Sequence, residues 1–346
     1  MTRSMVSPPR ALSARARAAL LGVALLAGCS SKPADTSTPG AGSSSATAKI
    51  PVRIGTLATE DSLPLWVDEQ MGYFATEGIP KVEIIPFQSA QERDVALASG
   101  AIDGFMGDII AAANLRASGK GVKIATIMLG ADQSQGRFGI AVPTPAGAEI
   151  KIGPDALKAL ANVPIGTSSA TIQEYVLDGL MDAAGVPADQ VKTEEVKKVP
   201  VRYELLMAGK LKAAALPEPF LPLAQQGGAT IAGDDTKATK NLSQTVLLFS
   251  EDFLNKPGGT ATAQAVLKSW DVAVNDINKN PDSYRQLLVD KARLPKPLAT
   301  TYKVQTYPVA QLPSETDVNR VLEWMKAKGY LKTDIAYSDL VLPQAK

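Results

Sequence analysis

The chain has 346 residues, of which 45% are hydrophobic and 21% charged, and its formal net charge is +1. This composition supports a sizeable core and provides no basic surface that would indicate a nucleic-acid partner. Because the chain contains no histidine and a single cysteine, Cys29, it cannot form a Ser-His-Asp triad, a Cys-His dyad or a zinc site with histidine or cysteine ligands. We therefore expect a binding protein without a metal or cofactor; an enzyme that uses carboxylates remains the alternative.

The first 28 residues have the pattern of a secretory signal peptide. Four arginines and no acidic residue precede a short apolar run, 18–27, that is too short to span a bilayer. The tetrapeptide Leu26-Ala-Gly-Cys29 resembles a bacterial lipobox, in which the cysteine receives a diacylglycerol and becomes the new N-terminus. The alternative is an ordinary signal peptide with its cleavage site beside Cys29. We predict an extracytoplasmic protein that is anchored to the bacterial cell membrane through lipid on Cys29.

Residues 29–49 are rich in Ser, Thr, Gly, Ala and Pro and lack aromatic and large aliphatic side chains. Such a segment cannot bury apolar surface, so it is predicted to be a flexible tether that spans roughly 25 Å.

Strand and helix patterns alternate from residue 50 onward. The first series predicts strands at 50–57, 82–86, 102–106 and 122–129, and helices from Asp61 or Ser62 to about Ala75, at 91–99 and at 109–117. The second series predicts strands at 138–142, 163–166, 191–196, 212–216 and 229–232, and helices at 153–162, 172–184, 201–208 and 222–226. After a polar return at 234–241, the chain is predicted to form a strand at 244–249 and helices at 260–279, 281–291 and 314–329.

This order indicates βαβ units and an α/β fold with mostly parallel sheets flanked by helices. We predict two lobes, lobe I from residues 50–137 and 244–346 and lobe II from residues 138–243, with a cleft between them. A concave site between two lobes is a common place for a small ligand.

Several short segments resemble the solute-binding proteins of bacterial ABC importers, in particular those for alkanesulfonates, nitrate, taurine and thiamine-pyrimidine precursors. They are Gly72-Tyr-Phe74, Glu77-Gly-Ile79, Leu97-Ala-Ser-Gly-Ala-Ile-Asp103, Glu174-Tyr175, the stretch 205–209 and Ala213-Ala-Ala-Leu-Pro-Glu-Pro219. The resemblance implies a two-lobed, type II periplasmic-binding-protein-like fold that closes on one small solute and delivers it to permease subunits, acting as a monomer. Eukaryotic thiamine-pyrimidine synthases share this family, but the histidine and cysteine cluster that serves their chemistry has no counterpart here.

Candidate ligand-binding residues lie where predicted strands end and helices begin, since helix N-termini at the carboxyl edge of a sheet present free N–H groups. The candidates are Leu57, Asp61 and Ser62 in the first turn, Gln88 and Ser89 in the second, Asp108 in the third, Gly166, Thr167, Ser168, Ser169 and Thr171 in the fourth, and Glu218 between two prolines.

Each candidate has a structural alternative. Asp61, Ser62 and Asp108 either receive a donor of the ligand or cap the following helix, and Gln88 and Ser89 either bind a solute or belong to a polar loop. Thr171 to Glu174 fits a capping box, but the other hydroxyls of the fourth turn are not needed for capping, so this turn is the preferred contact. Glu218 either accepts a hydrogen bond from the solute or closes the lobes by pairing across the cleft.

The solute class is left open between two alternatives. A sulfonate-like anion fits the fourth turn, and an uncharged pyrimidine-like solute fits the acids and amides of the other turns. The four turns contain no arginine, the usual bidentate partner of an anion, which weakens the first alternative. An exported ligand sensor, or an enzyme that uses Asp61, Asp108 and Glu218, is the alternative function.

Overall fold

The computed structural model describes residues 48–135, 137–143, 154–294 and 298–343. The predicted signal peptide, Cys29 and almost all of the predicted tether lie outside these ranges. Contacts group the chain from Ala46 onward into one compact unit. Within the described ranges, no helix is both long enough and apolar enough to cross a membrane.

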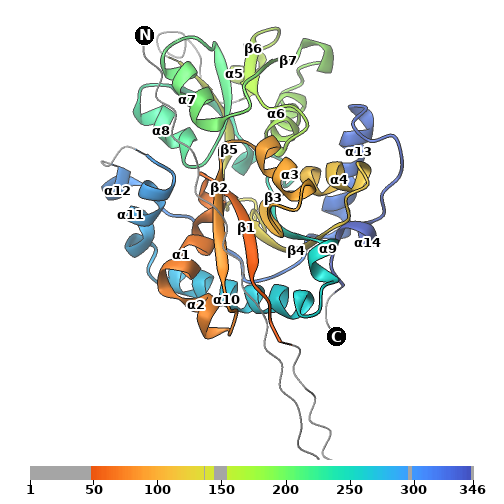
Figure 1. The fold of residues 1–346 in the computed structure, drawn as a ribbon. Coiled ribbons are helices and arrows are strands. Elements are labelled where there is room, and N and C mark those ends of the chain that lie inside the picture. The colour runs from red at the N-terminus through yellow and green to blue at the C-terminus, as the bar shows by residue number, and fades with distance from the viewer. Residues whose placement is uncertain (1–47, 136, 144–153, 295–297, 344–346) are drawn as a thin grey trace, which may run out of the picture. The chain divides into compact units, whose positions relative to one another are not determined.

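The fold contains two five-stranded sheets (Figure 1). The first sheet has the order β2-β1-β3-β10-β4 and comprises β1 (Val52–Leu57), β2 (Val82–Phe87), β3 (Gly104–Asp108), β4 (Val122–Leu129) and β10 (Thr245–Ser250). The second sheet has the order β7-β6-β8-β5-β9 and comprises β5 (Phe138–Val142), β6 (Pro164–Thr167), β7 (Lys192–Glu195), β8 (Ala213–Pro217) and β9 (Thr230–Asp234). The chain therefore leaves the first sheet after β4 and returns to it at β10.

Each sheet contains one strand that runs against the others. In the first sheet, β1 pairs in parallel with β2 and β3, whereas β10 is antiparallel to both β3 and β4. In the second sheet, β6 pairs in parallel with β7 and β8, whereas β5 is antiparallel to both β8 and β9. The reversed strand is in each case the first one that the chain forms after crossing from the other sheet. The predicted α/β class with mostly parallel sheets is confirmed.

Helices flank both sheets (Figure 1). Those that follow strands of the first sheet up to β4 are α1 (Leu63–Met71), α2 (Tyr73–Thr76), α3 (Ala90–Ala98) and α4 (Ile109–Ala117). Those of the second series are α5 (Pro154–Lys158), α6 (Ile172–Ala183), α7 (Val199–Met207) and α8 (Phe220–Gln226). The C-terminal part contains α9 (Glu251–Leu254), α10 (Gly259–Lys279), α11 (Pro281–Lys291), α12 (Leu298–Thr301), α13 (Glu315–Ala327) and α14 (Tyr337–Leu340).

The predicted helix from about residue 62 to Ala75 is wrong in two respects. Gly72 has φ 74°, a left-handed conformation that ends α1 and separates it from α2. At the other end, a single 3-10 turn, Glu60–Ser62, precedes α1, and Ser62 makes no side-chain cap. Its hydroxyl instead donates to the Leu57 carbonyl oxygen at 2.9 Å.

The start of α6 is capped, but not by the predicted reciprocal box. Thr171 Oγ1 accepts a hydrogen bond from the Gln173 N–H at 3.3 Å. Glu174 Oε2 accepts from the Ala170 N–H at 2.7 Å, one residue earlier than a capping box requires.

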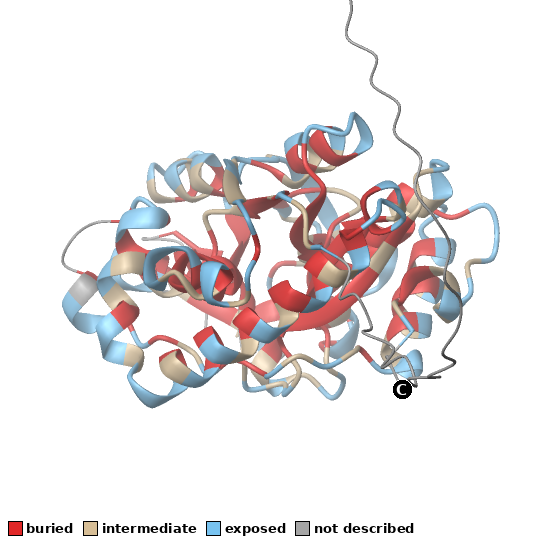
Figure 2. Ribbon diagram, turned by 60° about the horizontal axis from the view of Figure 1, so that its bottom comes forward, coloured by how far each residue is buried: buried red, intermediate tan, exposed pale blue. Residues whose placement is uncertain are grey.

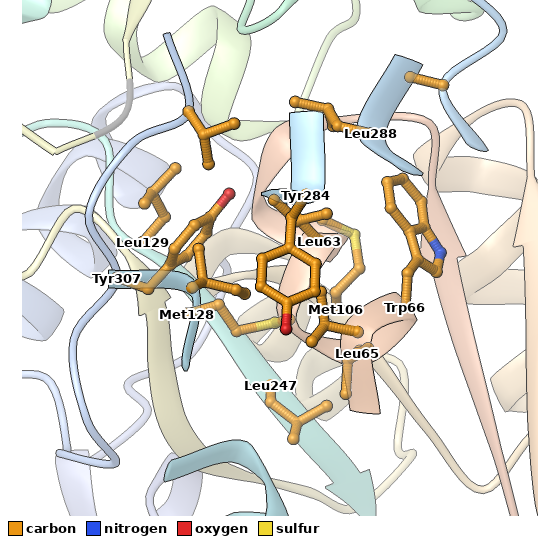
Figure 3. Close-up of a cluster of buried hydrophobic side chains, with 14 of the residues drawn as sticks. Leu63, Leu65, Trp66, Met106, Met128, Leu129, Leu247, Tyr284, Leu288 and Tyr307 are labelled. Carbon is orange, nitrogen blue, oxygen red and sulfur yellow. The ribbon is translucent and has the colours of Figure 1, made fainter. Parts of the chain in front are cut away.

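Buried residues occupy most of the inner strands of both sheets and the inner faces of the helices, whereas the edge strands β2 and β7 are half-buried and exposed (Figure 2). In the cluster beneath the first sheet, Leu63, Leu65 and Trp66 of α1 pack towards side chains of β3, β4 and β10 (Figure 3). Tyr284 and Leu288 of α11 belong to the same cluster. Burial of this apolar surface fixes α1 and therefore holds the turn between β1 and α1 at the sheet's carboxyl edge.

Helix α13 contacts helices that belong to different sheets. It packs against α4, which follows β3, and its Trp324 ring lies 5.2 Å from the ring of Tyr175 in α6. Trp324 Nε1 also donates to Asp178 Oδ2 at 2.9 Å. Helix α13 thus connects a helix of the first sheet to a helix of the second sheet.

Candidate ligand site between the two sheets

A cavity lies where the carboxyl ends of strands from both sheets meet. Its enclosed volume of about 40 Å³ leaves room for a few waters or a small chemical group. From the first sheet and its connections it is lined by Leu57, Thr59, Glu60, Asp61, Arg93, Met106, Gly107, Asp108, Leu129 and Thr245. From the second sheet and its connections it is lined by Arg137, Phe138, Ile172, Gln173, Pro217 and Glu218.

Four buried carboxyl side chains line this cavity, and two of them, Asp61 and Asp108, lie outside the network of Glu60 and Glu218 described below. Asp61 is 6% exposed, accepts a hydrogen bond from Thr59 Oγ1 at 2.7 Å, and has its pKa raised to about 6 by burial. Asp108 is 5% exposed, and burial raises its pKa although the charge of Arg93 opposes the rise. Among the residues that the structure describes, no lysine or arginine forms an ion pair with either carboxylate.

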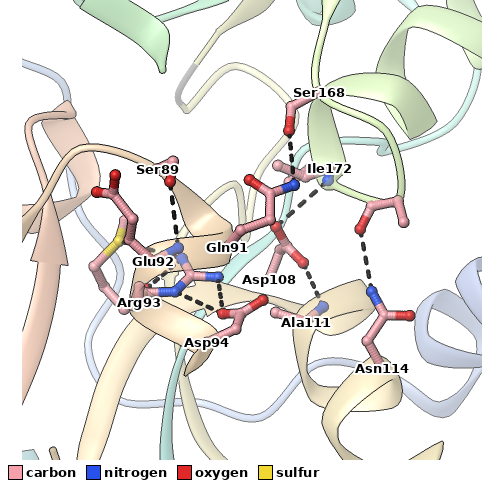
Figure 4. Close-up of polar contacts among 12 residues, drawn as sticks. Ser89, Gln91, Glu92, Arg93, Asp94, Asp108, Ala111, Asn114, Ser168 and Ile172 are labelled. Carbon is pink, nitrogen blue, oxygen red and sulfur yellow. Dashed lines mark hydrogen bonds and ion pairs between the residues drawn. The ribbon is translucent and has the colours of Figure 1, made fainter. Parts of the chain in front are cut away.

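Asp108 also caps one helix and contacts a second. Its Oδ1 accepts from the Ala111 N–H at 2.7 Å, at the start of α4, and its Oδ2 accepts from the Ile172 N–H at 3.4 Å, at the start of α6 (Figure 4). The capping alternative for Asp108 is therefore observed, and the residue lines the cavity as well. One carboxylate thereby occupies N–H donors from helices on both sides of the site.

Arg93 reaches the cavity from α3. Its Nε and Nη2 donate to Asp94 Oδ1 at 3.0 and 2.8 Å, and its Nη1 donates to the Met106 carbonyl oxygen at 2.8 Å (Figure 4). The guanidinium carbon lies 4.1 Å from the centre of the Phe105 ring. Arg93 is 1% exposed, so these contacts hold a buried positive charge that is already paired with the carboxylate of Asp94.

A second buried network joins both sheets to the C-terminal segment. The Tyr302 hydroxyl contacts Glu60 Oε2 and lies 2.8 Å from Glu218 Oε2, while Arg137 Nε donates to Glu218 Oε1 at 2.9 Å. A phenol carries one proton, so it cannot donate to both carboxyl groups at once. Burial and the nearby Glu218 raise the pKa of Glu60 to about 8, so Glu60 holds the additional proton at neutral pH.

Direct hydrogen bonds also connect the two sides of the site. Gln91 Nε2 donates to Ser168 Oγ at 3.2 Å, and Asn114 Nδ2 donates to the Ala170 carbonyl oxygen at 3.1 Å (Figure 4). Lys198 Nζ lies 3.1 Å from Glu92 Oε1 in a further contact of this kind. The helices of the first sheet and the turns of the second are therefore already in contact around the cavity.

Four of the residues predicted from the sequence line this cavity: Leu57, Asp61, Asp108 and Glu218. The others do not belong to its lining: Ser62, Gln88, Ser89, Gly166, Thr167, Ser168, Ser169 and Thr171.

The polar groups outside the lining mostly bond to the protein itself. Ser89 caps α3 through the Glu92 N–H at 3.2 Å, and Gln88 is exposed. Ser169 donates through both its N–H and its hydroxyl to Glu195 Oε2, at 3.0 and 2.6 Å. Thr171 Oγ1 donates to the Ser168 carbonyl oxygen at 2.7 Å.

The remaining members of the fourth turn are packed into the fold. A side chain on Gly166 would place its Cβ 2.6 Å from Leu211 Cδ1, so the glycine permits close packing here. Thr167 is fully buried.

The sequence-based selection missed seven charged or polar residues at the site: Thr59, Glu60, Arg93, Arg137, Gln173 and Thr245 in the lining, and Tyr302 beside it. Glu60 precedes the predicted Asp61, and its place in the same turn was the only sequence feature that could have identified it. Arg93, Arg137 and Tyr302 lie in a helix, before a strand and in the C-terminal segment, where no turn pattern marked them. The absence of arginine from the four turns therefore did not mean an absence of arginine from the site.

Two mixed sheets flanked by helices, with the cavity between their carboxyl edges, define the periplasmic-binding-protein fold. The alkanesulfonate-binding protein SsuA of Xanthomonas axonopodis pv. citri, bound to MOPS, matches with a TM-score of 0.70 and 16% identity over 84% of this chain and 98% of that chain. The periplasmic aliphatic sulphonate-binding protein SsuA of Escherichia coli matches with a TM-score of 0.69 and 16% identity over 84% and 97%. The periplasmic nitrate-binding protein NrtA of Synechocystis PCC 6803 matches with a TM-score of 0.68 and 17% identity over 82% and 83%.

The sequence of residues 45–288 matches the model of the NMT1-like family. This match covers more than half of the chain, so the protein belongs to that family. None of the curated proteins matches the sequence.

Proposed function

We propose that this protein is the solute-binding component of an ABC-type importer. The observation that supports this most strongly is the cavity, which residues from both sheets line together. A ligand held there would touch groups from both sides at once, which is what binding by closure requires. Three relatives with the same fold are named as sulfonate- or nitrate-binding proteins, which agrees with this proposal.

The mechanism that we propose is closure of two lobes around the solute. Lobe I comprises residues 50–137 and 244–346, lobe II comprises residues 138–243, and the chain crosses between them before β5 and before β10. A solute that contacts both lobes stabilises the closed state by its higher affinity for that state. Contacts between the lobes would stabilise the closed state further. They are the hydrogen bonds from Gln91 and Asn114 and the network around Tyr302.

The location follows from the N-terminal pattern. We propose that the protein is a lipoprotein. Lipid on Cys29 would anchor it to the bacterial cell membrane, on the periplasmic or outer face, with residues 29–49 as its tether. This arrangement would keep a monomeric binding domain close to permease subunits in the same membrane. Metabolic labelling with a palmitate analogue tests the anchor: wild-type protein should incorporate the label, and the C29S variant should not.

The solute is proposed to be a small organic molecule, either a sulfonate-like anion or a pyrimidine-like ring. Mass spectrometry of ligand that co-purifies with the native protein is the most direct test. Titration calorimetry against sulfonates, nitrate, pyrimidines, amines and small acids provides the second test, with at least one micromolar binder expected. Absence of any binder and of any co-purified ligand would contradict the proposal, and turnover of a panel compound would replace it by an enzymatic function.

A further inference from the structure

We infer that the solute carries a positively charged, N–H-donating group that Asp61 and Asp108 receive together. This inference rests on the proposed function, because it concerns the ligand of the same cavity. It argues against the sulfonate-like anion, and it requires a positive charge that an uncharged pyrimidine-like solute lacks.

The first argument is the charge of the two aspartates. Both are at least nine-tenths buried, both line the cavity, and neither forms an ion pair within the described part of the chain. Burial makes the charged form of each carboxyl group unfavourable and raises both pKa values, and the charge of Arg93 offsets only part of this rise. A cation placed between them would offset the remaining cost, because the hydrogen bonds from Thr59, Ala111 and Ile172 supply no net positive charge.

The second argument is that the protein already neutralises both arginines of the cavity. Arg93 pairs with Asp94 at 2.8 Å, and Arg137 pairs with Glu218 at 2.9 Å. A further carboxylate, Asp234, lies 3.8 Å from Arg137. The negative charges of Asp94, Glu218 and Asp234 therefore already balance the positive charges of Arg93 and Arg137. Asp61 and Asp108 add further negative charge, and an anionic solute would increase this excess.

The third argument concerns the helix N-termini, which normally bind anions through free N–H groups. At α4, the Ala111 N–H donates to Asp108 Oδ1. At α6, the Ile172 N–H donates to Asp108 Oδ2 and the Gln173 N–H to Thr171 Oγ1. The protein's own oxygens therefore occupy the donors that a sulfonate or nitrate would need.

Pairs of ions with the same shape and opposite charge test the inference. Guanidinium and nitrate are both planar ions of four heavy atoms, small enough for a cavity of about 40 Å³. Acetamidinium and acetate, also planar ions of four heavy atoms, repeat the comparison. Each compound is added at millimolar concentration, far below the molar range in which guanidinium denatures, to the full chain at pH 7.5 and constant ionic strength. Thermal shift and calorimetry are the readouts.

We expect at least one of the two cations to bind, with at least tenfold higher affinity than its anionic counterpart. The D61N variant removes one charge and keeps the shape of the side chain, so it should lower affinity for that cation at least tenfold. The D108N variant keeps an oxygen that can cap α4 and should lower affinity in the same direction, which preserves the test if D61N folds poorly. The control is D68N, since Asp68 is fully buried but does not line the cavity, and its affinity should equal that of the wild type.

The opposite results overturn the inference in recognisable ways. If the anions bind and the cations do not, or if D61N and D108N leave cation affinity within twofold of D68N, the inference is wrong while the proposed function stands. The proposed function itself fails if the broad panel and the co-purification experiment both yield no ligand, or if the protein turns over a panel compound.

Discussion

Two turns occupy equivalent positions in the two sheets and behave in opposite ways. Residues 57–62 follow β1, and residues 167–171 follow β6; each strand lies between two parallel neighbours in its sheet. The first turn lines the cavity with Leu57 and the carboxyl groups of Glu60 and Asp61. The second turn carries more hydroxyl groups, but they bond to the protein or are packed within it.

The difference shows that the number of polar groups in a turn does not measure what the turn can offer a ligand. Ser169 and Thr171 have found acceptors in Glu195 and in the Ser168 carbonyl group. Asp61 has a hydroxyl partner and, within the described residues, no ion pair, although the charge of Arg93 lowers its pKa; its charge is therefore more available to a ligand than the serine hydroxyls, which are already bonded. Availability depends on the neighbours that the fold supplies.

The largest expected effect comes from E60A in the first turn. The Tyr302 hydroxyl would lose its contact with Glu60, the Gln305 N–H would lose its buried acceptor, and a cavity would remain. We expect the free energy of unfolding to fall by about 3 kcal/mol, measured by urea denaturation. The control E69A removes an exposed partner of Lys291 and should change it by less than about 0.5 kcal/mol. Equal losses in the two variants would show that the network around Glu60 contributes little.

The E60Q variant tests the proton on this network. Since the pKa of Glu60 is raised to about 8 in the folded protein, the folded state holds a proton that the unfolded state releases above the ordinary carboxyl pKa of 4.5. This contribution is complete below about pH 4.5 and is lost as the pH rises to about 8. The wild-type Tm should therefore fall between pH 5.5 and pH 8.5 more than the Tm of E60Q. Parallel pH profiles would mean that Glu60 is ionised throughout.

In the second turn, T171A should have a smaller and purely structural effect. Thr171 caps α6 and holds the Ser168 carbonyl group. Loss of such a cap costs about 1 kcal/mol, and we expect that decrease in unfolding free energy with solute affinity unchanged within twofold. T171S, which keeps the hydroxyl, is the matched control and should recover most of the loss. A tenfold loss of affinity in T171A would show that this helix start takes part in binding.

The smallest effect is expected for S169A. Its hydroxyl bonds to Glu195 in an exposed position, so we expect a change of less than about 0.5 kcal/mol in stability and less than twofold in solute affinity. A tenfold weaker affinity would instead identify the turn after β6 as a ligand contact, and the contrast between the two turns would disappear. Calorimetry with the co-purified ligand provides the measurement.

The sequence predicted the order of elements well because that order depends on local periodicity. The bounds of α4, β4, β5 and α11 agree with the predictions. The break at Gly72 was missed because apolar side chains occur on both sides of it, so periodicity continued through the glycine. The reversed direction of β5 and β10 was not visible either, since strand pairing depends on residues far apart in the chain.

The candidate site was predicted only in part. Asp61, Asp108 and Glu218 were found because carboxylates at strand ends are a local signal. Tyr302 is 242 residues from Glu60 and 84 from Glu218, and no spacing rule connects residues at such distances. Arg93 sits within a helix, and only packing against Phe105 and Asp94 turns it towards the cavity.

By itself, the sequence determined the α/β class, the alternation of strands and helices, and the exclusion of histidine chemistry. These properties follow from residue type and periodicity, which the chain carries locally. Only the tertiary structure decided which polar groups face the cavity without a partner and which are bonded within the protein. The reason is that hydrogen bonds and ion pairs form between groups that are close in space, and partners such as Glu195 for Ser169 or Glu218 for Tyr302 lie far apart in the chain.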